Sequence, residues 1–495
     1  MPITLTDTEL ALHVANGGSS MNTRSWFLTM SLCGLILNTT AKADLASTQL
    51  GVTNGDDWEP AIAADGQTVY AYWPHYLANG SNPVNRDSGG VTCPQKSKTW
   101  TSYMYFQKST DGGVTWGPIT IPHCPMNGNV VDAQIVIGPN HRIIIANMDG
   151  ASSETPIYVN YSDDFGTTWH TPVNVAPTQG GDHPWLLDSG PGGVTVASEW
   201  AASKGTARCI TTIGHIADLA TGIVDLNVVP PPASIVVNPH IPGHQTDASL
   251  ATGGGIDSHG NSYYVYTDAL GPAKAATGDT YFWLARSSNH FTSGSVTESI
   301  IDQSGTELVI SGEGWDYFGG SIQMAILPRP GFASDRIVVV FNLSTALYPA
   351  APIAQRIYTR YSDDSGVTWS PRVELTTAPI GTMHGFPSLA ATASGVQVIW
   401  QDNRVNDVCT SQSSCGTWNN YSRFSADGAT NWTPETLVKA TNFIGTVPVG
   451  ITSAGFAHPY GDYTSSATDG LGNFFSIMGE GKSYTGPGTI YVVKY

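Results

Sequence analysis

Hydrophobic and polar positions along this chain alternate in short runs that recur in pairs. The first pair, 60–66 and 68–73, joins two β-rich runs through Asp65-Gly66. Alternation with a period of two, bounded by turn residues, predicts a β-hairpin. Seven such pairs occur along the chain, at 60–66/68–73, 132–138/143–148, 185–188/194–200, 248–254/263–267, 321–327/337–342, 387–393/396–401 and 463–468/474–478.

The spacing of these hairpins predicts the fold. Their starts lie roughly 50 to 75 residues apart, which suits the four-stranded blades of a β-propeller. The last hairpin is followed by one more strand, at 489–495, and we expect residues 48–53 to supply its outer neighbour. Strands from both termini would then close the ring and remove open edges. The sequence predicts an all-β, seven-bladed propeller over residues 44–495, with six blades as the alternative.

Four octets repeat a second, shorter pattern. They are Ser109–Trp116, Ser162–Trp169, Ser362–Trp369 and Ser425–Trp432, and they follow the Asp-box (BNR) pattern S-x-D-x-G-x-T-W. The fourth has Ala429 where the pattern has glycine, and a weaker echo lies at Ser287–Ser288. Asp and Ser oxygens accept hydrogen bonds from turn N–H groups. Glycine supplies a positive φ, and tryptophan buries a large ring. We therefore interpret the octets as structural hairpin turns.

With these octets the mature chain resembles the sialidase-like β-propeller superfamily, and the resemblance covers nearly all of it. It implies a carbohydrate-active protein whose substrate face lies opposite the octet turns. Typical sialidases carry an F-R-I-P-like segment in the first blade. Here that region reads Asp56-Asp57-Trp58-Glu59-Pro60-Ala61-Ile62, without arginine. The chain thus resembles the superfamily without the pattern of a typical sialidase.

The N-terminal region and the charge indicate where the protein works. A positive charge at Arg24, an apolar run over 26–37 and Ala41-Lys42-Ala43 predict a signal peptide at 21–43, hence a secreted or periplasmic protein. Residues 1–20 are interpreted as a mis-assigned start or a leader. The apolar run is too short to span a membrane. A net charge of −18 argues against a nucleic-acid partner.

Cysteine spacing predicts disulfides but no metal site. In an exported chain, Cys409 and Cys415 are expected to close a small loop, and Cys93 with Cys124 is the next expected pair. No C-x-x-C or H-E-x-x-H motif occurs, so no cofactor is identified. The sequence does not decide whether a structural Ca²⁺ ion is bound.

Polar and aromatic residues gather at the starts of the first hairpin strands and the ends of the second. Five of the 13 histidines fall there. Aromatic rings there are suited to stack on sugars, and carboxylates and amides to bind hydroxyl groups. The candidate catalytic residues are His75, His183, Glu199, His244, His384, Arg404 and Tyr463. The candidate substrate-binding residues are Trp58, Asp132, Asp182, Trp185, Asp268, Asn403 and His458.

Two of these residues carry a specific expectation. Glu199, beside Trp200 at a strand end, is expected to be partly desolvated, which fits acid–base work. Arg404 is expected either to clamp a substrate carboxylate or to pair with Asp402 or Asp407.

Three functions compete at this stage. A glycoside hydrolase needs two carboxylates, or a Tyr/Glu pair, flanking the scissile bond. A uronate-polysaccharide lyase needs a base and a cation, roles that His, Tyr and Arg fill. Seven-bladed propeller lyases are similar in using these residue types. The leading hypothesis is cleavage of glycosidic bonds in an acidic glycan by one of these routes, and a propeller that only binds glycans or proteins is the alternative.

Overall fold

The computed structural model describes most of the strands and leaves other segments out. The described residues are 45, 47–51, 55–77, 93, 102–150, 156–175, 182–188, 193–201, 209–218, 220, 223–224, 235–237, 251–268, 280–291, 296–304, 321–343, 356–380, 382, 384–404, 419–440, 464–481 and 488–495. All of them belong to one compact unit, 44–495. The first 43 residues lie outside the described part, and with them the predicted signal peptide.

The strands of this unit form antiparallel sheets of four or five strands. The first contains β2 (Gly55–Asp57), β3 (Ala61–Asp65), β4 (Thr68–Leu77) and β5 (Ser102–Ser109). The second contains β6 (Val130–Ile137), β7 (Ile143–Asp149), β8 (Ile157–Ser162) and β9 (Val173–Asn174), with a short 3₁₀ turn at Pro139–His141. The third contains β10 (Asp182–Asp188), β11 (Val194–Ala201), β12 (Cys209–Asp218), β13 (Ile223–Val224) and β14 (Ile235–Val237).

The remaining sheets follow the same order along the chain. The fourth contains β15 (Ala251–Ile256), β16 (Ser262–Asp268), β17 (Thr280–Ser287) and β18 (Val296–Ser304). The fifth contains β19 (Ile322–Leu327), β20 (Arg336–Leu343), β21 (Arg356–Ser362) and β22 (Val373–Glu374). The sixth contains β23 (His384–Thr392), β24 (Gly395–Asp402), β25 (Asn419–Ser425) and β26 (Thr436–Ala440). The last contains β27 (Ser465–Thr468), β28 (Phe474–Gly481), β29 (Gly488–Lys494) and β1 (Ser47–Gln49).

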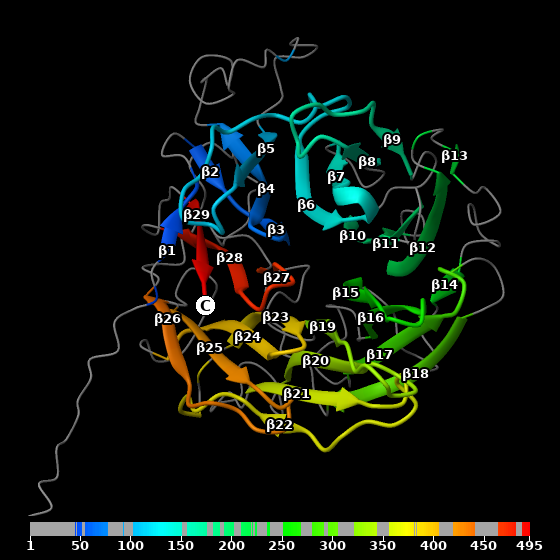
Figure 1. Ribbon diagram of the computed structural model, residues 1–495, viewed down its shortest axis with the longest axis vertical. Coiled ribbons are helices and arrows are strands. Elements are labelled where there is room, and N and C mark those ends of the chain that lie inside the picture. Colours follow the sequence, from blue (N-terminus) through cyan, green and yellow to red (C-terminus); the bar gives the residue numbers. More distant parts are fainter. Residues whose placement is uncertain are drawn as a thin grey trace, which may run out of the picture. The chain divides into compact units, whose positions relative to one another are not determined.

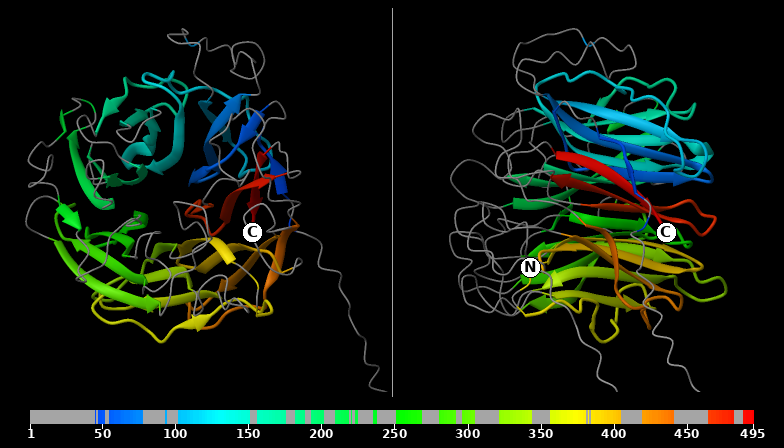
Figure 2. Two further views of the ribbon diagram at one scale, coloured as in Figure 1. Left: turned by 180° about the vertical axis from the view of Figure 1, so that it is seen from behind. Right: turned by 90° about the vertical axis from the view of Figure 1, so that its left-hand side faces the viewer.

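The sheets are the blades of a β-propeller, which confirms the predicted fold class. Their innermost strands contact one another in a closed cycle, β3, β6, β10, β15, β19, β23, β27 and back to β3, around the centre of Figure 1. Each of the predicted inner hairpins is present as an antiparallel pair. In the rear view of Figure 2, the red C-terminal strands lie between the blue first blade and the orange sixth.

Strands from both ends of the chain share the last blade, as predicted. Ser47, Thr48 and Gln49 of β1 pair with β29, so the N-terminal strand is the outer strand of the C-terminal blade. The hydrophobic core lies between neighbouring blades: Trp73 and Tyr105 of the first pack with Phe475 of the last. Closure at this seam therefore buries apolar surface as well as a sheet edge.

The four octets form hairpin turns of one geometry. In each, the Ser hydroxyl donates to the Asp Oδ1 at 2.7–2.8 Å and accepts the N–H of the fifth residue at 2.8–2.9 Å. Ala429 fills the glycine position at φ 75°. The echo at Ser287 is the same turn, with Asn289 in place of Asp and Phe291 N–H donating to the Ser287 hydroxyl. The interpretation of the octets as folding devices is confirmed.

Strand register assigns the two ends of each blade. Val69, at the start of β4, pairs with Ser109 of the first octet, whereas His75, near the end of β4, pairs with Asp57. The octet turns therefore share one end with the first hairpin turn. The opposite end, which we call the rim, carries the start of each innermost strand and the end of the strand beside it. Of the predicted site residues, Asp57's neighbour Trp58, His75, His183 and His384 are among those described at this end.

Candidate functional site

The rim brings titratable residues opposite one another in three blades. Asp57 pairs in register with His75 and His384 with Asp402. Asp182 pairs in register with Glu199 through the backbones of β10 and β11. The sequence prediction that strand starts and strand ends meet on this face is thus confirmed by the strand pairing, while the chemistry of these residues stays a prediction.

β-Bulges occur near the rim at five strand starts, one of them between Ala251 and Gly253 of the fourth blade. Two residues of β6, Asp132 and Ala133, stand opposite one residue of β7, because Val131 pairs with Met148 and Gln134 with Ala146. The strand starts of the first, third and sixth blades gain one residue in the same way. Bulges of this kind turn a side chain out of the regular pleat and are common beside active sites.

Four of these bulges hold a residue other than glycine at positive φ. The residues are Glu59 at 43°, Asp132 at 58°, His183 at 46° and Phe386 at 52°. Left-handed backbone costs such a residue roughly 1–2 kcal/mol. In three of the four the next residue is proline, which disfavours helical conformations further. Strain repeated at equivalent positions, where no local preference asks for it, is typical of functional sites.

Glu59 and Asp132 join the first two blades through this strained backbone. The carboxylate Oε2 of Glu59 accepts the backbone N–H of Asp132 at 3.2 Å. Glu59 is fully buried, and Asp132 is 5% exposed. The Glu59 carboxylate is therefore bonded to the backbone of Asp132 from the neighbouring blade, and both residues lie away from bulk water. Electrostatic interactions are stronger in such a setting than in water.

His75 and Asp57 form a second buried pair beside them. His75 Nδ1 lies 2.9 Å from Asp57 Oδ1, which also accepts Trp73 Nε1–H at 2.7 Å. The imidazole stacks on Tyr105 with ring centroids 4.6 Å apart. A carboxylate at Nδ1 fixes the orientation of the ring and leaves Nε2 as its basic nitrogen. This arrangement suits a base.

His384 lies in a third polar group in the sixth blade. Its Nε2 is 2.8 Å from the Thr376 hydroxyl and 3.8 Å from Asp402 Oδ2, and all three residues are buried. Arg404 Nε and Nη2 donate to the two oxygens of Asp402 at 2.8 and 2.5 Å. Burial raises the pKa of Asp402, although Arg404 acts to lower it.

Arg404 thus takes the second of the two roles expected for it. Its guanidinium pairs with Asp402, also pairs with Glu435, and lies 3.6 Å from the centre of the Tyr421 ring. These contacts engage the guanidinium inside the protein. A role in clamping a substrate carboxylate would require one of them to open.

Other predicted site residues have different positions. Trp58 is fully buried and packs at a tilt against Tyr76, with ring centroids 4.6 Å apart, so the structure places it in the core instead of on a sugar-binding surface. Asn403 is also buried. His183 and Trp185 are partly exposed on β10. For Asp182, Glu199 and Asp268 only the backbone is described, and His244, His458, Tyr463, Cys409 and Cys415 lie outside the described residues.

The sequence reading missed Glu59 as a site residue. Glu59 stands in the first-blade segment that lacks the arginine of typical sialidases. The recurrence of a residue followed by proline at three strand starts, Glu59-Pro60, His183-Pro184 and Phe386-Pro387, was the signal that could have found it. Thr376 and Glu435 had no signal, because they reach the rim from other elements.

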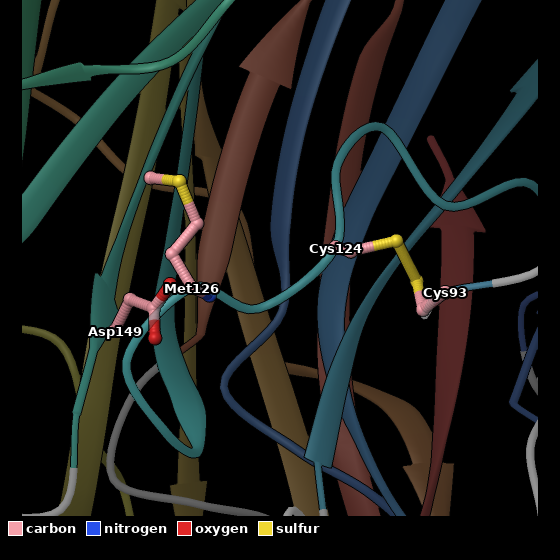
Figure 3. The surroundings of a disulfide bond; sticks show 4 residues. All are labelled: Cys93, Cys124, Met126 and Asp149. Atoms are coloured by element: carbon pink, nitrogen blue, oxygen red, sulfur yellow. Dashed lines mark hydrogen bonds between the residues drawn. A yellow bond between two sulfur atoms is a disulfide. The ribbon is translucent and has the colours of Figure 1, made fainter. Parts of the chain in front are cut away.

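The predicted Cys93–Cys124 disulfide is confirmed, with a Cα–Cα distance of 5.4 Å (Figure 3). Among the described residues, no three His, Cys, Asp or Glu side chains gather to hold a metal ion. The same part of the chain has no helix with the length and apolar character of a membrane crossing.

No protein-family model matches the chain, and no curated protein does. Similar solved structures include the Hadza microbial sialidase Hz136, at 12% identity over 90% of this chain and 68% of that one, with a TM-score of 0.43. The GH93 α-L-arabinofuranosidase of Fusarium graminearum shares 14% identity over 72% of this chain and 92% of its own, with a TM-score of 0.43. A Trypanosoma rangeli sialidase mutant shares 11% over 91% and 59%, with a TM-score of 0.41.

The activities of those proteins are their own, and the chemistry of this chain has to be argued from its own residues. Two features describe its fold: the closed cycle of blades and the four octet turns. On these two features the chain resembles the sialidase-like β-propellers.

Proposed function

We propose that the chain is an exported carbohydrate-active enzyme that hydrolyses glycosidic bonds in an acidic glycan, with Glu59 and Asp132 as its reacting carboxyl groups. The observation that carries this proposal is the contact between the two residues. Both lie on strained backbone at the rim, and the N–H of one donates to the carboxylate of the other.

Glycoside hydrolysis requires two carboxyl groups beside the scissile bond. One protonates the leaving oxygen, and the other activates water or attacks the sugar. A rigid strand start holds such groups more firmly than an exposed loop does, and firm placement lowers the barrier. Glu59 and Asp132 have the residue types, the shared location and the fixed backbone that this chemistry needs.

The acidic substrate is the finer part of the proposal. Three described histidines, His75, His183 and His384, lie at the rim, and histidine becomes cationic near neutral pH. Of these, His183 is the one whose side chain is partly exposed, and it stands on the bulge of the third blade. A cationic imidazole there would face the carboxylate of a sialic or uronic acid unit.

Elimination is the second candidate, and the His75–Asp57 pair favours it. A lyase removes the proton at C5 of a uronic acid with a base and stabilises the resulting charge. The Nδ1 contact of His75 to Asp57 sets up Nε2 as that base. His75 is only 1% exposed and Glu59 is fully buried, so elimination and hydrolysis both require the rim to open at the first blade.

One assay separates these reactions. The folded protein is incubated with a panel of sialosides and uronic-acid polysaccharides, and reducing ends are followed together with the absorbance of unsaturated uronate. Reducing ends alone are the expected result and indicate hydrolysis. Both signals together indicate elimination. Retained binding without either signal contradicts cleavage and identifies a binding propeller.

Substitutions test the assignment to Glu59 and Asp132. Asp132→Asn and Glu59→Gln are expected to lower kcat by about 10²-fold or more, since acid–base groups contribute that much. Asp469→Asn is the matched control, because Asp469 is equally buried but accepts turn N–H groups at the octet end. Equal losses in the control and in Asp132→Asn would contradict the assignment.

A further inference from the structure

The chain reaches Asp132 through a segment that is fixed at several points. The first is the disulfide, which joins Cys124 to the buried Cys93. Both cysteines pack with the cluster of the first and last blades that includes Trp73. Figure 3 shows that the chain runs from Cys124 directly toward Asp149. The start of the second blade is therefore tied to the core of the first.

Asp149 is the second fixing point. Its carboxylate accepts three consecutive backbone N–H groups, from Met126 at 2.6 Å and from Asn127 and Gly128 at 2.9 Å. Successive N–H groups that converge in this way form a site for an anion, and here the anion is a side chain of the same blade. Asp149 belongs to β7 and pairs in register with Val130, two residues before Asp132.

Burial of the Asp149 carboxylate costs free energy. The residue is fully buried, and no Lys, Arg or His of the described residues forms an ion pair with it. Burial raises the pKa of Asp149, even though three N–H groups act to lower it. A turn at the surface would satisfy the same N–H groups with water at little cost. Asp257 and Asp469 are also buried carboxylates that accept turn N–H groups. Asp149 differs from them because the N–H groups it accepts belong to the segment that leads to Asp132.

Ser102 is the third fixing point. Its hydroxyl accepts the N–H of Val130 and donates to the carbonyl of the same residue, both at 2.8 Å. Val130 is thereby held on both sides just before the bulge. Beyond it, the N–H of Asp132 donates to Glu59. The segment is thus fixed at residues 124, 126–128 and 130, shortly before Asp132 with its left-handed backbone.

We infer that Asp149 is a positioning residue that, together with the Cys93–Cys124 disulfide, holds Asp132 in its strained, productive orientation. This inference rests on the proposed function of Asp132. Asparagine at 149 keeps the shape but turns an NH₂ group toward one of the three N–H donors. The segment 126–128 then loses a bond, and the backbone at Asp132 gains freedom. Small displacements of this kind lower turnover strongly.

The first experiment compares Asp149→Asn with Asp257→Asn. Asp257 is also buried and accepts two turn N–H groups, from His259 and Asn261, but it lies at the octet end. On the glycan that the wild type cleaves, Asp149→Asn is expected to lower kcat by roughly 10-fold or more with KM nearly unchanged, at a temperature where both variants are folded. Asp257→Asn should keep the wild-type kcat. A wild-type kcat in Asp149→Asn, or an equal loss in the control, would overturn the inference.

The second experiment needs no substrate and separates this inference from the proposed function. Amide hydrogen exchange of the intact protein reports the hydrogen bond from Asp132 N–H. In Asp149→Asn, and in the paired Cys93→Ala, Cys124→Ala variant, exchange at Asp132 is expected to rise about 10-fold, while the octet amide of Gly166 stays unchanged. Unchanged exchange at Asp132 overturns the positioning role, whether or not the protein cleaves a glycan. Faster exchange in a protein that cleaves nothing overturns the proposed function alone.

Discussion

The carboxyl groups of the octets differ in their surroundings from two carboxyl groups of the rim. At the octet end, hydrogen bonds from Thr115 lower the pKa of Asp111 to about 2, and those from Asn431 lower that of Asp427 to about 2. At the rim, burial raises the pKa of Asp149 and Asp402. Asp111 is half-buried and Asp427 is exposed, and both accept N–H groups of their turns. Asp149 and Asp402 are fully buried. The octet turns therefore gain stability from their carboxylates, whereas the rim keeps these two carboxyl groups buried at a cost in free energy.

The largest expected effect on stability is at the rim. Arg404→Ala leaves the fully buried Asp402 without its bidentate partner, so we expect a loss of about 3–5 kcal/mol in the free energy of unfolding. Urea denaturation measures it. Arg356→Ala is the control, because its partner Glu374 is 46% exposed and such pairs contribute less than about 1 kcal/mol. Equal losses in the two variants would show that the rim pair is no more costly to break than a surface pair.

A smaller effect is expected at the octet end. Ser162→Ala removes the acceptor for the buried N–H of Gly166, so we expect a loss of about 1–3 kcal/mol. Thermal melting and kcat are measured on the same sample. The comparison predicts a lower melting temperature with an unchanged kcat. A variant that is stable but inactive would place chemistry at the octet end and break the comparison.

Relief of backbone strain is expected to raise stability at both ends but to lower activity only at the rim. His183→Gly removes a left-handed histidine and should stabilise the fold by about 1 kcal/mol while lowering activity. Ser365→Gly, at φ 60° in the third octet, should also raise stability but leave activity unchanged. Unfolding curves and initial rates of both variants provide the test. If His183→Gly gains stability and keeps full activity, the bulge has no functional role.

The smallest expected effect is on the pH dependence of stability. The octet carboxyls have folded pKa values below their unfolded ones, so their contribution is present above about pH 4 and is lost as the pH falls toward 2. Asp149 and Asp402 have raised pKa values, so their contribution is full below about pH 4 and is lost as the pH rises.

Urea midpoints between pH 2 and 7 resolve these opposite slopes. Asp427→Asn should flatten the dependence below about pH 4, and Asp149→Asn should flatten the part above it. Slopes that match the wild type in both variants would show that these carboxyl groups do not set the pH dependence.

The two ends also differ in how much of them the sequence predicts. The contacts of an octet are local, because Ser162, Asp164 and Gly166 form hydrogen bonds within five residues. The turn, its end of the blade and the opposite rim can therefore be predicted from the octet sequence. The bulges are not local. Positive φ at Glu59 and His183 opposes the preference of a residue before proline, and packing of the whole blade is what imposes it. The burial of Trp58 against Tyr76 depends on the same packing. The sequence pattern does not show this packing and therefore predicts Trp58 as a substrate-binding residue.

Locating a bound glycan tests whether the chemistry lies at the rim. A crystal structure of the Asp132→Asn variant with an acidic oligosaccharide is expected to show the sugar at the rim, with its scissile oxygen within hydrogen-bond distance of residue 59 or 132. Oligosaccharide bound at the octet turns, with none at the rim, would contradict the assignment of chemistry to this end of the blades.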